Sequence, residues 1–193
     1  MTKARLHPSL LEFKGAMGDM VFKKRGKKVY VSIKSKGTSN PSDAQLAQRK
    51  IFRKAVNYAT TAMADETLRA FYEALAERKE STARGLCIGD FLNEPNIDDL
   101  DFSKYHGQVG DRILITTSDD VGVVEVNVDL SKADGTHIEK GKAVENGTGS
   151  GNWEYVATVP VPLGTDIFIS AEAFDRPGHR TVSSANPIVG ESH

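Results

Sequence analysis

Apolar and polar residues alternate in short segments along the second half of the chain. The segments are RILITTS at 112–118, VGVVEVNVDL at 121–130, NWEYVATV at 152–159 and DIFISAEAF at 166–174, and Gly, Pro, Asn or Asp clusters follow them. A period of two residues places alternate side chains on the same face of a strand. The stretch from 112 to 182 is therefore predicted to form an antiparallel β-sandwich.

One face of these strands is predicted to form the core of the sandwich, because its apolar side chains occupy alternate positions. The predicted core residues are Ile113, Ile115, Val124, Val126, Val128, Trp153, Tyr155, Ile167, Ile169 and Ala171.

The same alternation near the start of the chain predicts a β-hairpin with a turn at 25–26. A two-stranded hairpin is marginal alone, so it should lie on the helices that follow or pair with another subunit. The glycine pair at 15 and 18 predicts a tight turn or bulge. The hairpin strands are predicted at 19–23 and 28–34, with Met20 and Phe22 opposite Val29, Val31 and Ile33.

Between these two regions the apolar period changes to about 3.6 residues, which predicts helices. Ser42 and Gln45 form a capping-box pattern before a helix at 43–64. Asp65 is the predicted N-cap of a second helix that ends near Gly85, and the two helices are expected to form an antiparallel hairpin. A short third helical turn is predicted before Pro95. The predicted inner stripe of the first helix is Leu46, Ile51, Phe52, Ala55, Val56, Ala59 and Met63.

Charge is distributed unevenly along the 193 residues. Residues 1–36 carry ten positive and two negative side chains, residues 37–80 carry seven and six, and residues 81–193 carry eight and eighteen. Such asymmetry indicates charged partners rather than a particular fold. The predicted fold class is α+β, with a basic domain at 1–92 (β-hairpin and helices) and an acidic, immunoglobulin-like β-sandwich at 97–188.

The run SDDVGVVEVNVDL, then ADGT, NWEYVATV and AEAFDRPGHRT, resembles bacterial immunoglobulin-like and fibronectin-type-III-like modules over residues 97–188. The resemblance implies a stalk, adhesive or shell-decorating module without catalytic residues. The chain departs from antibody domains because it lacks their paired cysteines and carries Trp153 on a later strand. The front, FKGAMGDMVFKKRGKK with PSDAQLAQRKIFRKAV, is similar to the start of a group of small uncharacterised bacterial proteins.

Two charged stretches are the predicted interaction surfaces. The basic hairpin tip at 23–28 could grip phosphates, but the acidic remainder of the chain would repel a long polyanion, so nucleic acid is a weaker alternative to a protein partner. Acidic residues between the helices and the sandwich could meet basic residues of that partner. The predicted interaction residues are Phe22, Lys23, Lys24, Arg25, Lys27, Lys28, Val29 and Val31, together with Asp98, Asp99 and Asp101.

No catalytic residue, metal ligand or cofactor is predicted. Cys87 is the single cysteine, so no intrachain disulfide can form, and the five histidines have no metal-ligand or Cys–His spacing. Asp119, Asp120 and Asp175 lie in turns that an immunoglobulin-like topology would bring together, where Ca²⁺ binding or ordinary Asx turns are possible. Asx turns are the favoured interpretation, because the spacing is not that of a dedicated calcium loop.

The sequence favours a non-enzymatic structural subunit that self-associates head to tail, basic front to acidic sandwich, as a filament, ring or surface component. The alternative is a binding module whose sandwich loops recognise a glycan or a protein. No signal peptide or membrane span is expected, which suggests a cytoplasmic protein or one exported by another route.

Overall fold

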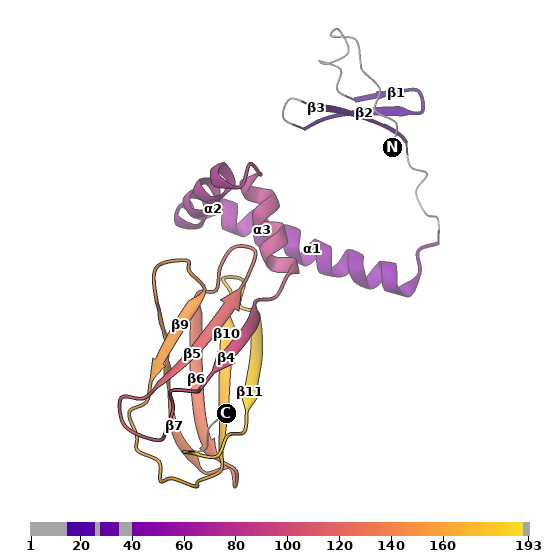
Figure 1. Cartoon of the computed structure of the whole chain (residues 1–193). Coiled ribbons are helices and arrows are strands. Elements are labelled where there is room, and N and C mark those ends of the chain that lie inside the picture. Colours follow the sequence, from indigo (N-terminus) through magenta and orange to yellow (C-terminus); the bar gives the residue numbers. More distant parts are fainter. Residues whose placement is uncertain (1–14, 26–27, 35–39, 191–193) are drawn as a thin grey trace. The chain divides into compact units, whose positions relative to one another are not determined.

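A computed structural model describes residues 15–25, 28–34 and 40–190 of the chain (Figure 1). The described part is mixed α+β, with three helices and three antiparallel sheets. The chain divides into two compact units, residues 1–46 and 47–193, so the boundary falls within the first helix. The domain division expected at residues 92–97 stays a prediction.

The first unit contains a three-stranded antiparallel sheet, which we call the front sheet. Its strands are β1 (Gly15–Met17), β2 (Met20–Arg25) and β3 (Lys28–Ile33), paired in the order β1-β2-β3. The predicted hairpin is therefore present, and the predicted tight turn at the glycine pair connects an additional strand. Gly18 has a φ of 58° in the two-residue turn between β1 and β2, a conformation that glycine adopts without strain.

The helices of the chain are α1 (Asp43–Ala64), α2 (Glu66–Arg78) and α3 (Ala83–Leu92). The predicted capping box is present, because the Gln45 amide donates to Ser42 Oγ and the Ser42 amide donates to Gln45 Oε1. The Asp65 carboxylate accepts from the Leu68 amide at 2.8 Å, which confirms the N-cap of α2.

Two helix predictions need correction. The second helix ends at Arg78, and Gly85 lies in the first turn of α3, where its amide donates to the N-cap side chain of Thr82. Thr82, a residue type favoured at N-caps, starts α3 earlier than the predicted third helical turn, which was therefore too short. Because α2 packs most closely against α3, the expected two-helix hairpin is a three-helix cluster instead.

The predicted inner stripe of α1 is only partly buried. Ala55 and Ala59 are fully buried, whereas Ile51 and Phe52 are about half-exposed because the N-terminal half of α1 extends beyond α2 and α3 (Figure 1). Leu46 is also about half-exposed. It precedes Ala55 by about two and a half helical turns and therefore lies on the opposite side of the helix.

Two four-stranded antiparallel sheets share one hydrophobic core in the second unit (Figure 1). The first sheet has the order β4-β5-β9-β8 and the second has the order β11-β10-β6-β7. The strands are β4 (Asn96–Asp101), β5 (Arg112–Ser118), β6 (Glu125–Lys132), β7 (His137–Lys142), β8 (Val144–Glu145), β9 (Asn152–Val156), β10 (Ile167–Phe174) and β11 (Arg180–Ala185).

Nine of the ten predicted core residues of these sheets are buried. The exception is Val124, which immediately precedes β6 and is 44% exposed although it keeps the period of two with the buried Val126 and Val128. Leu130 and Ala173 extend the buried face at the far ends of β6 and β10. The Trp153 indole N–H donates to Thr117 Oγ1 at 3.1 Å, which satisfies its polar atom within the core.

The helical cluster and the two sheets contact each other within the second unit. The Arg176 guanidinium lies 3.8 Å from the ring centroid of Phe71, and the rings of Phe91 and His179 are 5.2 Å apart. The Thr181 hydroxyl donates to the carbonyl of Pro95, which ties the connection after α3 to β11.

Candidate functional site

The front sheet has one strongly apolar face. Strand pairing places residues opposite each other on the same face, and the pairs Met17–Met20, Met20–Ile33 and Phe22–Val31 are all apolar. Ile33 is 80% exposed, and Met17, Met20 and Val31 are each about half-exposed. By contrast, Phe22 is buried within its own chain. The exposed apolar area therefore comes mainly from the residues around Phe22.

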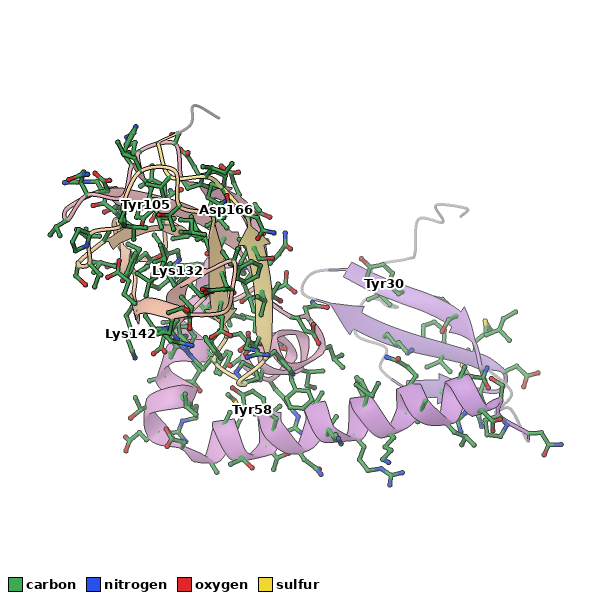
Figure 2. All side chains as sticks on the ribbon, turned by 90° about the horizontal axis from the view of Figure 1, so that it is seen from below. Tyr30, Tyr58, Tyr105, Lys132, Lys142 and Asp166 are labelled. Atoms are coloured by element: carbon green, nitrogen blue, oxygen red, sulfur yellow. The ribbon has the colours of Figure 1, made fainter. Side chains whose placement is uncertain are left out.

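The predicted basic residues lie along this hairpin. Figure 2 marks Tyr30 on the front sheet. Lys23 is exposed on β2 and pairs with Tyr30 of β3, which is about half-exposed and, being next to Val31, the partner of Phe22, lies on the opposite face from Phe22. Arg25 pairs with Lys28 at the end of the hairpin, one position beyond the pair of Lys24 with Val29. Lys27 lies outside the described residues. The strand pairing thus brings Lys23, Lys24, Arg25 and Lys28 to one end of the front sheet.

The second charged surface is the outward face of the β4-β5-β9-β8 sheet, which we call the acidic face. Strand pairing aligns Asp101 with Leu114, Leu114 with Glu154, and Glu154 with Val144 across the four strands. Val144 is 70% exposed and Val156 is 44% exposed, so apolar and acidic side chains alternate on this surface. The charged and apolar residues of the acidic face are Asp99, Asp101, Arg112, Leu114, Val144, Glu154 and Val156, and the Arg112 guanidinium lies 2.7 Å from the Glu154 carboxylate.

The three predicted acidic interaction residues all belong to β4, the edge strand of that sheet. Asp98 lies at a register shift and accepts hydrogen bonds from Asn96 and Ser118. Hydrogen bonds from Ser103 lower the pKa of Asp101, which keeps its carboxylate ionised. Within the described residues, none of the three aspartates forms an ion pair. Their negative charge is therefore available to a partner.

The outward face of the other large sheet has its charges paired internally. Lys140 lies 3.6 Å from Asp129 and 3.4 Å from Glu172, and Arg180 lies 3.0 Å from Glu172. Lys142 pairs with Glu125 on the same face. A basic partner would have to break these pairs, so this face offers less uncompensated charge than the acidic face.

A buried polar cluster joins the helices. Tyr72 donates from its hydroxyl to Asp90 Oδ2, and the Tyr58 and Tyr72 hydroxyl oxygens are 3.1 Å apart. Asp90 is fully buried, and its Oδ1 has no hydrogen-bond partner in the described part of the chain. Burial raises the pKa of Asp90 to about 6, and the negative charges of Asp119 and Asp175 act in the same direction.

This cluster does not resemble a nucleophilic site. Cys87 is fully buried beside it, and burial raises the pKa of the thiol to about 11, so the thiolate form is disfavoured. His179 Nδ1 lies 2.6 Å from Asp175 Oδ2, a pair that the sequence analysis did not predict. The pair closes the β10–β11 loop, because Asp175 Oδ1 also accepts from the amides of Gly178 and His179.

Two of the three aspartates considered as calcium ligands, Asp119 and Asp175, form Asx turns. Asp119 Oδ2 accepts from the amides of Val121 and Gly122, and Asp175 accepts from its own loop as described above. Among the residues with described positions, no group of three or more His, Cys, Asp or Glu side chains could hold a metal ion. The turn interpretation is confirmed for Asp119 and Asp175, whereas the Asp120 carboxylate accepts from the side chain of Asn93.

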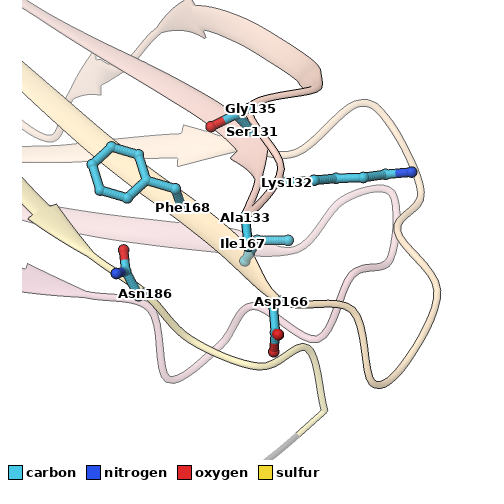
Figure 3. A pocket seen from close by; sticks show the side chains of 8 residues that line it. All are labelled: Ser131, Lys132, Ala133, Gly135, Asp166, Ile167, Phe168 and Asn186. Atoms are coloured by element: carbon cyan, nitrogen blue, oxygen red, sulfur yellow. The ribbon is translucent and has the colours of Figure 1, made fainter.

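One open pocket of about 460 Å³ lies at the end of the β6, β10 and β11 strands (Figure 3). Phe168 supplies an exposed aromatic ring, and Asp166 and Asn186 supply polar groups. The Lys132 side chain extends away from the Phe168 ring (Figure 3). The polar groups of this pocket therefore do not converge on one ligand position.

The chain matches no protein-family model, and no curated protein sequence matches it either. Within the described residues, no helix is long and apolar enough to cross a membrane.

Proposed function

We propose that this chain is a non-enzymatic structural subunit that associates with copies of itself head to tail. One observation carries the proposal: the front sheet exposes Met17, Met20, Val31 and Ile33 on one face, with Ile33 at 80% exposure, at the same end of the chain as its excess of positive charge. A small sheet with one apolar face is marginal until something covers that face. Burial of these side chains in a contact between subunits supplies that cover.

The acidic face supplies the complementary surface. It combines exposed Val144 and Val156 with Asp99 and Asp101, within a segment that carries eight positive and eighteen negative side chains. Opposite charge increases the rate of encounter and fixes orientation, while apolar burial contributes most of the affinity. Because the two surfaces differ, each contact leaves one free surface of each kind, and association continues as a ring or a filament.

We also infer that the two large sheets form an immunoglobulin-like module. The orders β4-β5-β9-β8 and β11-β10-β6-β7 correspond to the strand orders A-B-E-D and G-F-C-C′ of such folds, with the strands lettered in chain order. This correspondence supports the resemblance of residues 97–188 to bacterial modules of that class. Glycan recognition ranks below self-assembly, because Trp153 is buried in the core and the groups around Phe168 diverge.

The test of self-association is light scattering on wild-type protein and on a Lys24→Glu/Lys28→Glu variant, each at low and high salt. We expect the wild type to associate more strongly at low salt and the variant to associate at least about tenfold more weakly, because like charges placed opposite each other in a contact cost several kcal/mol.

An Arg69→Glu/Lys132→Glu variant is the matched control, since it makes the same change in charge at exposed residues of α2 and β6. It should associate like the wild type. Equal loss in both variants would show that net charge, and not the hairpin, controls association.

A further inference from the structure

Of the two large sheets of the described chain, only the one with the acidic face offers outward carboxylates without an ion pair, Asp99 and Asp101, together with exposed apolar side chains; its Glu154 is paired with Arg112. From this geometry we propose that the apolar face of the front sheet of a second copy docks directly on it, sheet against sheet. The inference rests on the proposed self-association and adds which two surfaces meet.

The apolar parts of the two surfaces match. On the front sheet, Met17, Met20, Val31 and Ile33 surround the buried Phe22. On the acidic face, Leu114 lies between β4 and β9, and Val144 and Val156 lie toward the other edge. Packed sheets lie about 10 Å apart with their side chains interdigitating, a spacing suited to Val, Ile and Met.

The charged parts match as well. Lys24 pairs with Val29, one pair of the same phase beyond Phe22–Val31, and Arg25 pairs with Lys28 at the last described position of the hairpin, so these three basic residues lie at one end of the front sheet. Asp98, Asp99 and Asp101 lie along β4, at one edge of the acidic face and beside its apolar residues. A single docking orientation can therefore place the hairpin end over β4 while the apolar residues meet over β5, β9 and β8. The two subunits then meet in one defined relative orientation.

The outward face of the β11-β10-β6-β7 sheet is a poorer partner. Lys140, Lys142 and Arg180 already neutralise its carboxylates, so a basic surface there meets positive charge as well as negative. Val182 is exposed on this face, at 47%, and provides a control position of the same residue type as Val144.

A second copy is the occupant because both halves of the contact, one basic and one acidic, are present on this chain. A contact between two different surfaces of identical subunits repeats, whereas a contact within one chain would consume both surfaces and stop association. The two cases differ in their dependence on concentration, which makes them separable by experiment.

Disulfide cross-linking between engineered cysteines tests this contact, since the native Cys87 is fully buried. Full-length chains carrying Ile33→Cys are mixed with chains carrying Val144→Cys, oxidised mildly and analysed by mass spectrometry and non-reducing gel. We expect a mixed dimer that forms at least about tenfold faster than with Val182→Cys, because docking raises the effective concentration of the paired thiols. The Ile33→Cys chain alone should form few dimers.

Other outcomes would overturn the inference in distinguishable ways. Equal cross-linking of Val144→Cys and Val182→Cys, in protein that light scattering shows to be associated, would mean that the subunits assemble through a different surface. Rapid dimerisation of Ile33→Cys alone would mean that two front sheets pack on each other. An intramolecular bond in a dilute Ile33→Cys/Val144→Cys double variant would place the contact within one chain. Protein that stays monomeric at every concentration would refute the proposed function itself.

Discussion

Replacing Trp153 with alanine is expected to lower the free energy of unfolding by about 3–5 kcal/mol, the usual range for removing a large aromatic side chain from a core. Trp153 is 7% exposed, lies in the core shared by the two large sheets and donates its indole N–H to Thr117. Truncation leaves a cavity between the sheets that the surrounding strands can fill only partly.

Chemical denaturation followed by circular dichroism measures this change. Val156→Ala is the matched control, because Val156 lies on the same strand but on the outward face. It should cost less than about 1 kcal/mol, as surface substitutions usually do. A loss below about 1 kcal/mol for Trp153→Ala would contradict the core position of this residue and would revive the glycan-binding alternative.

The Asp90→Asn variant is expected to remove a pH dependence of stability worth about 3 kcal/mol, since the pKa rises from 3.8 to about 6 on folding and each unit corresponds to about 1.4 kcal/mol. The folded chain binds the Asp90 proton more tightly than the unfolded chain does. The stabilising contribution of Asp90 is therefore complete below pH 3.8 and is lost as the pH rises to about 6.

Stability measured by urea denaturation from pH 4 to pH 7 tests this expectation. The free energy of unfolding of Asp90→Asn minus that of the wild type should be larger at pH 7 than at pH 4. Ala83→Ser on the same helix is the control, because neither side chain titrates, so its stability relative to the wild type should not vary with pH over that range. A difference between Asp90→Asn and the wild type that does not vary with pH would mean that Asp90 has an ordinary pKa in the fold.

Local patterns in the sequence predicted much of the fold. The capping box of Ser42 and Gln45, the N-cap Asp65 and the alternation in β5, β6, β9 and β10 each act over a few residues, and the structure contains all of them. The predicted burial of Val124 and of the first turns of α1 was wrong. Burial depends on whether another element packs against a side chain, and the neighbouring residues in the sequence do not determine that packing.

The residues that the sequence analysis missed depend on contacts between distant segments. Asp90 meets Tyr72 from 18 residues away, and the acidic face forms only when β8 and β9 lie beside β5. No local pattern marks Asp90, because in the sequence it is a single polar residue within a predicted helical turn. The outward position of Leu114, Glu154 and Val156 could have been predicted, because these residues alternate with the buried residues of β5 and β9.

Complementation between two disabled variants tests head-to-tail association most directly. Lys24→Glu/Lys28→Glu disables the front sheet and leaves the acidic face intact, whereas Asp99→Lys/Val144→Lys disables the acidic face and leaves the front sheet intact. The mass of each variant alone, and of their equimolar mixture, is measured by sedimentation equilibrium at low salt. The wild type, measured alongside, should form larger species than any of these samples.

The proposal predicts that each variant alone is monomeric and that the mixture forms dimers and nothing larger. Only one intact front sheet and one intact acidic face can then meet, and no second contact is left to extend the assembly. A mixture that stays monomeric while the wild type associates would contradict head-to-tail contact between these two surfaces. A wild-type chain that stays monomeric at high concentration in every salt condition would contradict self-association itself.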